Sequence, residues 1–332
     1  MQSSIRQLGI LLLILFLLVS LALPYWQVAH APELLARADN PRPAEEDRRV
    51  ERGRILSADG QELARSNRDA TGIITRTYAY PPLAATVGYW SGRYGTAGIE
   101  AAKNDALRGV AGLNVGDTLA RRFLHRPAVG DDVVLTLDLR LQKVADEVLG
   151  QSNGAVVLLD ANTGAILALA SHPYFDPNRL EADWTKIKDD PARPLLNRAT
   201  QGLYTPGSTF KTLTLGAALD TGIVSPGTVF SYTLHAPDAL RHGWWHENEY
   251  HTLCQNHATD KNPLSLAEVY SWSCNVAFSE IGLKVGPDAY TEYARRFGLD
   301  TVIPLEIPVT PSRLYHTRDY FSGQERFYAL AS

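Results

Sequence analysis

The chain has 332 residues, of which 45% are hydrophobic and 20% are charged, and its formal net charge is −4 at pH 7. This length predicts one or two domains, and the hydrophobic share is sufficient for a packed core. The mild negative charge, without a strongly basic segment or a basic stripe interleaved with aromatic residues, argues against a nucleic-acid partner.

The first predicted element is an apolar helix over residues 8–26, which contains no charged residue. A helix of this length spans about 28 Å, close to the ~30 Å hydrocarbon thickness of a membrane. Residues 8–26 are therefore predicted to be a single transmembrane anchor, and residues 1–7 a cytoplasmic tail. Arg6 is the only charged side chain before the span, which agrees with a cytoplasmic N-terminus and an extracytoplasmic location for the rest of the chain.

A cleaved signal peptide is the alternative interpretation of this segment. Ala29-His30-Ala31 has the small-x-small pattern of a cleavage site. The aromatic pair Tyr25-Trp26 at the end of the apolar run fits an interfacial anchor better, so the anchor is the prediction adopted here.

Three further segments follow the helix. Residues 27–51 are predicted to be a polar, proline-containing linker. Residues 52–130 combine short apolar stretches with many glycines and scattered charges, and we interpret them as a small α+β pedestal domain without obvious chemistry. A predicted strand over residues 131–138, followed by a helical pattern over 139–145, marks the start of the next domain at residue 131.

Residues 131–332 are predicted to form an α+β domain of helices layered on a sheet. Two apolar, β-rich runs, 154–159 and 165–170, flank a hairpin signal over residues 160–164. Helical patterns come next, around residues 208–221, 264–285 and 288–297. Strands followed by helices are typical of an α+β layered domain.

Ser208 and Lys211 form a Ser-x-x-Lys motif, the most informative feature of the chain. Pro206-Gly207 is a turn signal and the following residues are largely apolar, so Ser208 is predicted to lie in the first turn of a buried helix. Lys211 then lies one turn away on the same face. A serine hydroxyl is a weak nucleophile unless a base removes its proton, and a lysine is that base only if burial or nearby cations lower its pKa.

A second pattern, Ser273-Cys274-Asn275, strengthens the first. Alone, Ser-x-x-Lys is expected about once by chance in ~330 residues, and an exposed helical pair is its simpler interpretation. A hydroxyl and an amide two residues apart both point into one cleft if they occupy a turn between helices. The alternative is a polar break that only satisfies local backbone groups.

Together these motifs resemble the penicillin-binding proteins, whose signature is S-x-x-K, then S-D-N or a relative, then K-T-G. The context Tyr-x-Pro-Gly-Ser-Thr-Phe-Lys around Ser208 is far rarer than the dyad itself. Residues 154–178 and 197–199 resemble the family's transpeptidase domain, and residues 52–55 and 59–64 resemble the start of the non-catalytic domain of class B members. The segments that look most like the penicillin-binding protein A type are residues 40–42, 94–100 and 104–109.

The resemblance implies a peptidoglycan D,D-transpeptidase with a penicillin-binding or serine β-lactamase-like catalytic domain. Ser208 is then the nucleophile that attacks a D-Ala-D-Ala stem peptide, and Lys211 the general base. Ser273 relays a proton to the leaving group, and Asn275 binds the acylated peptide or orients Lys211. The implied partners are stem peptides, β-lactams as substrate mimics, the membrane and a membrane-embedded glycan polymerase. No metal or organic cofactor is needed.

A histidine-rich segment raises the possibility of a metal site. His242, His246, Cys254 and His257 crowd one polar, tryptophan-containing stretch, with His-x3-His and Cys-x2-His spacings that are compatible with zinc ligands. Solvated loop histidines are the simpler interpretation.

The two cysteines of the chain, Cys254 and Cys274, are predicted to form a disulfide because the domain that carries them is placed outside the membrane. Closing a ~20-residue loop stabilises by roughly 3 kcal/mol in the chain-entropy model. The bond would also restrain the loop that carries Ser273 and Asn275.

The third family motif, Lys-Thr/Ser-Gly, is absent from the sequence. Lys284-Val285-Gly286 ends a helical pattern and precedes Pro287, so we interpret it as a helix C-terminus and not as an edge strand. Loss of one oxyanion donor with that motif costs about 10²–10³ in rate. We therefore expect a C-terminally truncated transpeptidase that reacts poorly, if at all, with a penicillin.

Two other interpretations remain open besides a truncated form of an active class B transpeptidase. The chain would be either a catalytically incomplete, membrane-anchored scaffold or binding partner of the cell-wall synthesis machinery, or a β-lactam sensor or class D-like β-lactamase. The pedestal region over residues 52–130 argues against the lactamase, which would not need it.

Overall fold

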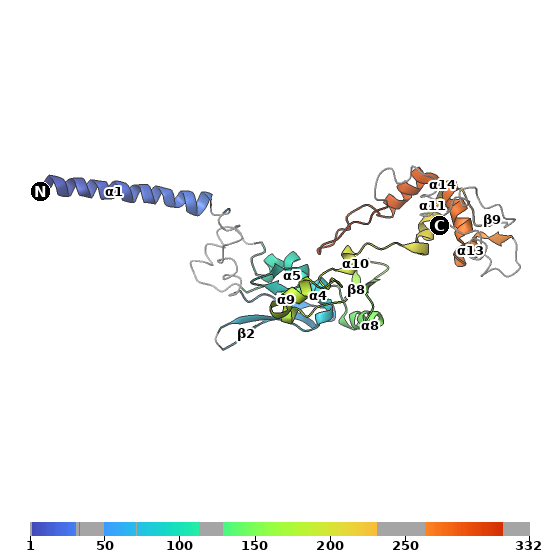
Figure 1. Ribbon diagram of the computed structural model, residues 1–332, viewed down its shortest axis with the longest axis horizontal. Helices are drawn as coiled ribbons and strands as arrows, with labels where there is room; N and C mark the ends of the chain where they lie inside the picture. The colour runs from blue at the N-terminus through green and yellow to red at the C-terminus, as the bar shows by residue number, and fades with distance from the viewer. Residues whose placement is uncertain are drawn as a thin grey trace. The chain divides into compact units, whose positions relative to one another are not determined.

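The computed structural model describes residues 2–30, 33, 50–70, 72–112, 129–230 and 263–314. The chain divides into two compact units, Met1–Ala199 and Thr200–Ser332, which are described separately below. Figure 1 shows the elements of both, from α1 at the blue end of the colour bar to α14 in orange.

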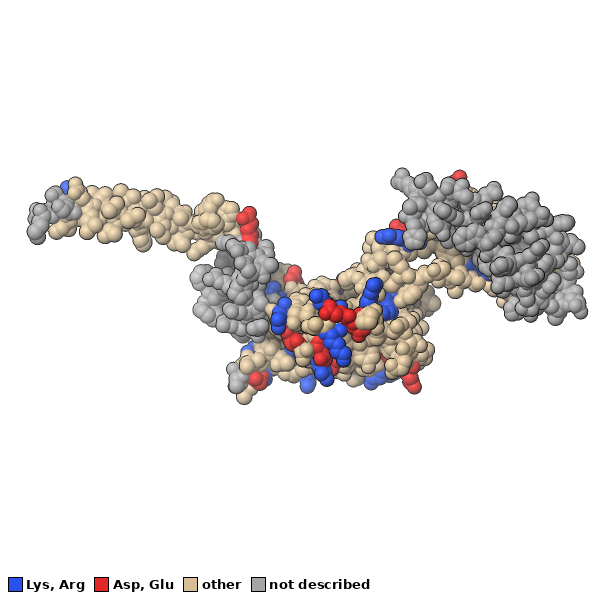
Figure 2. Space-filling view, in the orientation of Figure 1, with Lys and Arg blue, Asp and Glu red and all other residues tan. Residues whose placement is uncertain are grey.

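The N-terminal segment is one continuous apolar helix. α1 (Gln2–Pro24) passes directly into a π-helical turn, η1 (Tyr25–Ala29). The stretch Ile5–Gln27 is long and apolar enough to cross a membrane, and Figure 2 shows a helix surface almost free of charged side chains. It contains the span predicted over residues 8–26 and indicates membrane anchoring.

The first unit continues with a four-stranded sheet of strand order β3-β2-β1-β6. β1 pairs antiparallel with β2, β2 antiparallel with β3, and β1 parallel with β6. The strands are β1 (Ile55–Leu56), β2 (Glu62–Arg68), β3 (Ile74–Tyr78) and β6 (Val133–Val134). Between β3 and β6 lie η2 (Pro81–Leu83), α4 (Ala84–Val87), β4 (Trp90–Ser91), β5 (Gly95–Thr96), α5 (Gly98–Ala102) and α6 (Asn104–Leu107).

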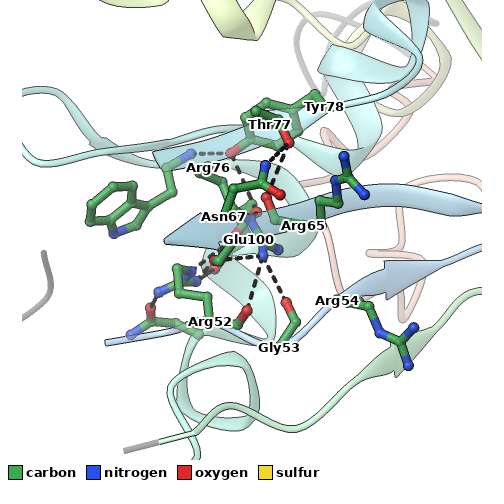
Figure 3. Close-up of polar contacts among 12 residues, drawn as sticks. Arg52, Gly53, Arg54, Arg65, Asn67, Arg76, Thr77, Tyr78 and Glu100 are labelled. Atoms are coloured by element: carbon green, nitrogen blue, oxygen red, sulfur yellow. Dashed lines mark hydrogen bonds and ion pairs between the residues drawn. The ribbon is translucent and has the colours of Figure 1, made fainter. Parts of the chain in front are cut away.

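A buried ion-pair network joins α5 to this sheet. The Glu100 carboxylate accepts from Arg52 Nε at 3.0 Å and from Arg76 Nε at 2.7 Å, and all three side chains are at most 2% exposed. Arg76 also donates to the Gly53 carbonyl at 2.8 Å. Figure 3 shows both guanidinium groups converging on Glu100. Burial lowers the pKa of Arg52 and raises the pKa of the Tyr78 hydroxyl beside it, so the cluster depends on the Glu100 carboxylate that pairs with both arginines.

Other charged side chains pair at the surface. Arg54 Nη2 lies 2.6 Å from Asp132 Oδ2, and both side chains are more than a third exposed. On the face shown in Figure 2, basic and acidic side chains of the described residues are interspersed and form no large field of one sign. Exposed pairs of this kind contribute little to stability.

The predicted strand over residues 131–138 is shorter than expected. Only Val133–Val134 pair with β1. The Leu135 N–H still donates to the Leu56 carbonyl of β1 at 2.8 Å, and the chain then passes to another hairpin, where the Asp138 N–H donates to the Leu167 carbonyl at 2.9 Å. Asp138 caps α8 (Leu139–Leu149) by accepting from two backbone N–H groups, and its hydrogen bond with Arg140 lowers the pKa of Asp138 to about 2.

The predicted hairpin is confirmed as β7 (Gly154–Leu159) and β8 (Ile166–His172), paired antiparallel from Gly154↔His172 to Leu159↔Ile166. Its turn forms because the Asp160 carboxylate accepts from the backbone of the two residues before Gly164, which has a φ of 73°. α8 packs on β8, where buried Ala145 meets Ala168 and Ala170.

The first unit ends with η3 (Pro177–Arg179), α9 (Leu180–Lys188) and the start of α10 (Arg198–Gln201). Asn178 completes the free edge of β3, since its amide accepts from Tyr78 N–H at 2.9 Å and donates to the Tyr78 carbonyl at 3.0 Å. Trp184 of α9 stacks on Tyr94, with ring centroids 4.2 Å apart. These contacts hold residues 178–184 against Tyr78 and Tyr94 of the pedestal region.

The second unit is a helical cluster around α11 and α14, which pack against each other. Its fully buried centre includes Ala217 of α11 and Phe278, Ile281 and Tyr290 of α14. Its elements are η4 (Gly207–Phe210), α11 (Lys211–Asp220), β9 (Val229–Phe230), β10 (Leu264–Ser265), α13 (Leu266–Ser271) and α14 (Asn275–Arg296).

The helical pattern predicted over residues 264–285 is two helices and not one. α13 begins with a capping box between Ser265 and Glu268 and ends at Ser271, before α14 starts at Asn275. α14 is interrupted where predicted: Gly286 has a φ of 76°, and Pro287 starts the second half. Lys284 therefore lies at a helix C-terminus, as predicted.

Candidate active site

Ser208 lies in η4, a single 3₁₀ turn immediately before α11. Gly207 supports this turn with a φ of 58°, a left-handed value that glycine adopts without strain. The prediction of a buried α-helical turn is correct for Lys211, which is 2% exposed, and wrong for Ser208, which is exposed. The tighter 3₁₀ turn is common at helix N-termini and leaves the hydroxyl accessible while the amine is enclosed.

The Lys211 amine lies among all the residues predicted to share its site. Nζ is 3.3 Å from Ser208 Oγ, 3.0 Å from Ser273 Oγ and 2.8 Å from the Ser273 carbonyl oxygen. It also donates to Asn275 Oδ1. Two segments separated by more than 60 residues of chain therefore meet at one amine.

The acceptors around Lys211 determine how the N–H groups and the lone pair of an unprotonated amine are oriented. A neutral amine has two N–H donors and one lone pair. The Ser273 carbonyl and Asn275 Oδ1 only accept, so they take the two N–H groups. The lone pair is then left for a hydroxyl hydrogen of Ser208 or Ser273, which is the arrangement that a general base requires.

Burial lowers the pKa of Lys211 from 10.5 to about 8, because a charged amine loses solvation in an enclosed site. The Phe278 ring, which is fully buried, lies 5.8 Å from Nζ. The groups that Lys211 is seen to contact are neutral. No carboxylate in the described ranges is bonded to it to hold the proton.

Ser273 lies in a turn between two helices, which is the condition given above for its hydroxyl and the Asn275 amide to share one cleft. Its φ of 54° is left-handed, which is uncommon for a residue with a side chain. The Ser273 N–H donates to the Tyr270 carbonyl at 3.0 Å, and the Cys274 N–H donates to the Val269 carbonyl at 2.9 Å. This turn directs both the carbonyl and the hydroxyl of Ser273 at Lys211, and it starts α14 with Asn275.

The predicted metal ligands His242, His246, Cys254 and His257 all lie outside the described residues. Within the described residues no three His, Cys, Asp or Glu side chains are grouped to hold a metal ion. Cys274 is 1% exposed, but Cys254 belongs to the residues outside the description, so the disulfide stays a prediction.

Two residues beside the site carried no distinguishing sequence signal, Phe278 and Tyr270. Each is an aromatic residue in an apolar helical stretch, where packing is the ordinary interpretation. They are distinguished only by position: Phe278 lies beside Lys211, and Tyr270 lies beside Thr212, the next residue in α11.

Known families match both regions of the chain. The family described as "Penicillin binding protein transpeptidase domain" matches residues 154–322, and "Penicillin binding protein A dimerisation domain" matches residues 52–133.

Individual relatives agree with these matches. Peptidoglycan D,D-transpeptidase PbpA of Mycolicibacterium smegmatis is 36% identical over 335 residues, covering 92% of this chain and 65% of the relative. Peptidoglycan D,D-transpeptidase MrdA of Escherichia coli K12 is 32% identical, covering 70% of this chain and 37% of the relative. The imipenem acyl-enzyme complex of penicillin-binding protein A from M. tuberculosis has a TM-score of 0.73 at 31% identity, covering 87% of this chain and 68% of that chain.

The fold and these matches define the class: an N-terminal apolar helix, a dimerisation domain and a transpeptidase domain of mixed helices and sheets. The chain belongs to the penicillin-binding protein transpeptidase family, and it is similar to the penicillin-binding protein A type. The predicted family and fold class are thereby confirmed. The chain spans 65% of the length of the M. smegmatis relative and 63% of that of a M. tuberculosis PbpA.

Proposed function

We propose that this chain is a serine-type peptidoglycan D,D-transpeptidase that works through an acyl-enzyme on Ser208. The observation that carries the proposal is the position of the Lys211 amine. Nζ lies 3.3 Å from Ser208 Oγ, and the lowered pKa of Lys211, about 8, leaves part of the amine unprotonated at neutral pH.

In the acylation step Ser208 Oγ bonds to the carbonyl carbon of the penultimate D-alanine, and its proton passes to Lys211 Nζ. The peptide C–N bond then breaks, and the leaving D-alanine amine takes a proton from Lys211 through the Ser273 hydroxyl. The Ser208 N–H, at a helix N-terminus, donates to the developing oxyanion. Asn275 holds the Lys211 amine through the bond described above. An amine of a second stem then bonds to the acyl carbon, the bond to Ser208 Oγ breaks, and the proton that the amine loses returns to Oγ, forming the crosslink.

The same chemistry makes β-lactams the expected inhibitors. Opening of the strained ring places an acyl group on Ser208 that mimics the acyl-peptide. The relative from M. tuberculosis was solved as imipenem and penicillin G acyl-enzymes, which supports this extension to the present chain.

The decisive experiment is covalent labelling of the full chain in detergent with a fluorescent penicillin. Label on Ser208, located by peptide mass spectrometry and absent from Ser208→Ala, supports the proposal at whatever rate it forms. A wild-type chain that takes no label, or a Ser208→Ala chain that keeps it, overturns the acyl-enzyme. The absence of label on the wild-type chain favours the catalytically incomplete scaffold of the cell-wall machinery.

The domain division and topology belong to the same proposal. Residues 52–130 are assigned as the pedestal and 131–332 as the transpeptidase domain, with the N-terminus cytoplasmic, a single span, and the catalytic domain extracytoplasmic beside a membrane-embedded glycan polymerase. The apolar helix, with Arg6 before it, supports this orientation. Protease added to intact spheroplasts should remove the transpeptidase domain; its full protection would contradict the topology.

We also propose the disulfide between Cys254 and Cys274. The 1% exposure of Cys274, next to the Ser273 turn, supports it, because a bond at this position would restrain the segment that carries Asn275. Detection of two free thiols in the unreduced, unfolded chain would contradict it.

A further inference from the structure

The Ser273 turn depends on contacts outside itself. A non-glycine residue at a φ of 54° occupies a sparsely populated backbone region, which persists only where neighbouring structure restrains it. The bonds from Lys211 to Ser273 restrain it from one side. Those bonds belong to the reaction, however, because the amine must release the hydroxyl when protons move. A restraint independent of the reacting groups is therefore needed.

Tyr270 provides such a restraint at both of its ends. Its carbonyl accepts the Ser273 N–H at 3.0 Å. Its hydroxyl lies 2.8 Å from Thr212 Oγ1, and Thr212 is the residue after Lys211 in α11. One side chain thus connects the last turn of α13 to the first turn of α11, and these two segments carry Ser273 and Lys211.

The Tyr270 ring also packs against Phe278, whose ring lies beside the Lys211 amine. Its centroid is 6.0 Å from that of Phe278, and the Phe278 ring lies 5.8 Å from Lys211 Nζ. The Phe278 ring therefore contacts both Tyr270 and the Lys211 amine. Tyr270 makes none of its observed hydrogen bonds to the reacting atoms and is itself 40% exposed, so removal of its hydroxyl leaves the core intact.

We propose that Tyr270 is a positioning residue for the acylation of Ser208: its hydroxyl bond to Thr212 holds the Ser273 turn against the Lys211 amine. The proposal rests on the function proposed above. It assigns Tyr270 and Thr212 one shared role that neither the Ser-x-x-Lys motif nor the Ser-x-Asn motif includes.

The chain offers a matched control for this bond. Tyr293 of α14 donates through its hydroxyl to Asp220, at the far end of α11. Like Tyr270, Tyr293 links a helix next to the Ser273 turn to α11 through its hydroxyl. Asp220 is nine residues beyond Lys211 in α11, about 13 Å along a helix. Tyr293→Phe therefore removes a tyrosine hydroxyl bond to α11, one that is stronger because its acceptor is a carboxylate, without touching the site.

The first experiment measures the rate of acylation of the full chain by a fluorescent penicillin. Tyr270→Phe and Thr212→Val are each expected to slow it by about fivefold, the effect of one hydrogen bond. The double variant should be no slower than the slower single variant, because both changes remove one bond. Tyr293→Phe should stay within about twofold of wild type.

Other patterns overturn the proposal. Wild-type rates in Tyr270→Phe contradict it directly, and an equal loss in Tyr293→Phe reduces it to general helix packing. Slowing in Tyr270→Phe but not in Thr212→Val means that the hydroxyl acts on the substrate and not through Thr212. Additive losses in the double variant likewise exclude a shared bond.

A second readout does not need acylation, so it separates this proposal from the function on which it rests. The chain is produced with ¹³C-labelled lysine, and the Lys211 Cε signal is assigned from its absence in Lys211→Met and titrated by NMR. Tyr270→Phe should move the Lys211 midpoint upward, toward that of an ordinary lysine, and Tyr293→Phe should not. A wild-type chain that takes no penicillin label contradicts the proposed transpeptidase function. A Lys211 midpoint that Tyr270→Phe leaves unchanged contradicts only the positioning role of Tyr270.

Discussion

The lowered pKa of Lys211 predicts how the acylation rate depends on pH. An ordinary lysine, with a pKa of 10.5, is unprotonated in about one molecule in 3,000 at pH 7, whereas a lysine with a pKa of about 8 is unprotonated in about one in ten. Burial therefore increases the supply of the base by about 300-fold at neutral pH. Below pH 8 the acylation rate should fall about tenfold per pH unit, and above it the rate should level off.

The assay is single-turnover labelling of the full chain with a fluorescent penicillin between pH 5.5 and 9.5. Lys211→Arg is the matching variant, because its guanidinium stays protonated throughout this range, and it should lose acylation at every pH. A flat profile between pH 6 and 8, or a Lys211→Arg chain that retains the wild-type profile, would refute the assignment of Lys211 as the base.

The same group affects stability in the opposite sense from a lysine whose pKa is raised by an ionic partner. The folded-state pKa of Lys211, about 8, is below the ordinary value of 10.5, so the unfolded chain binds the extra proton between these values. The free energy of unfolding should therefore rise with pH from about 8 to 10.5. Lys211→Met lacks this group, and the wild-type-minus-variant difference in denaturant midpoint isolates the effect. A difference that falls across this window would contradict the burial of the amine.

Three further predictions concern neighbouring features. Glu100→Ala leaves two buried arginines unpaired and should cost about 3–5 kcal/mol in urea unfolding, whereas exposed Glu62→Ala should cost less than about 1 kcal/mol; equal losses would refute the role of the network. Asn178→Ala should speed hydrogen exchange at the Tyr78 amide at least about tenfold, and unchanged protection would count against that edge contact. Ser273→Ala should slow acylation by about 10²-fold with little change in thermal midpoint; unaltered kinetics would remove Ser273 from the proton path.

Local signals in the sequence were sufficient for several of the elements. The apolar run without charges specifies a helix long enough for a membrane, and the Asp160–Gly164 turn specifies the β7–β8 hairpin. Gly286 and Pro287 mark the interruption of α14. Each of these depends on residues a few positions apart, and so the sequence alone predicts them.

The errors occurred where neighbours far along the chain decide the structure. The strand predicted over residues 131–138 pairs in the sheet only at Val133–Val134, and by Asp138 the chain bonds to another hairpin. The continuous helical pattern after residue 264 breaks at the Ser273 turn, whose left-handed backbone no periodicity reveals. The sequence pattern likewise did not predict the partners of Glu100, since Arg52 and Arg76 bond to it from distant positions in the chain.

For the site, the sequence alone determined the residue types and their order: a serine one turn before a lysine, then a hydroxyl and an amide two residues apart. It also placed the family. The tertiary structure decided that Lys211 is enclosed while Ser208 is exposed, and that the Ser273 carbonyl and Asn275 share the amine. The reason is physical. A motif lists the groups, but a pKa depends on how much water and which acceptors surround the amine, and packing between α11 and α14 sets both.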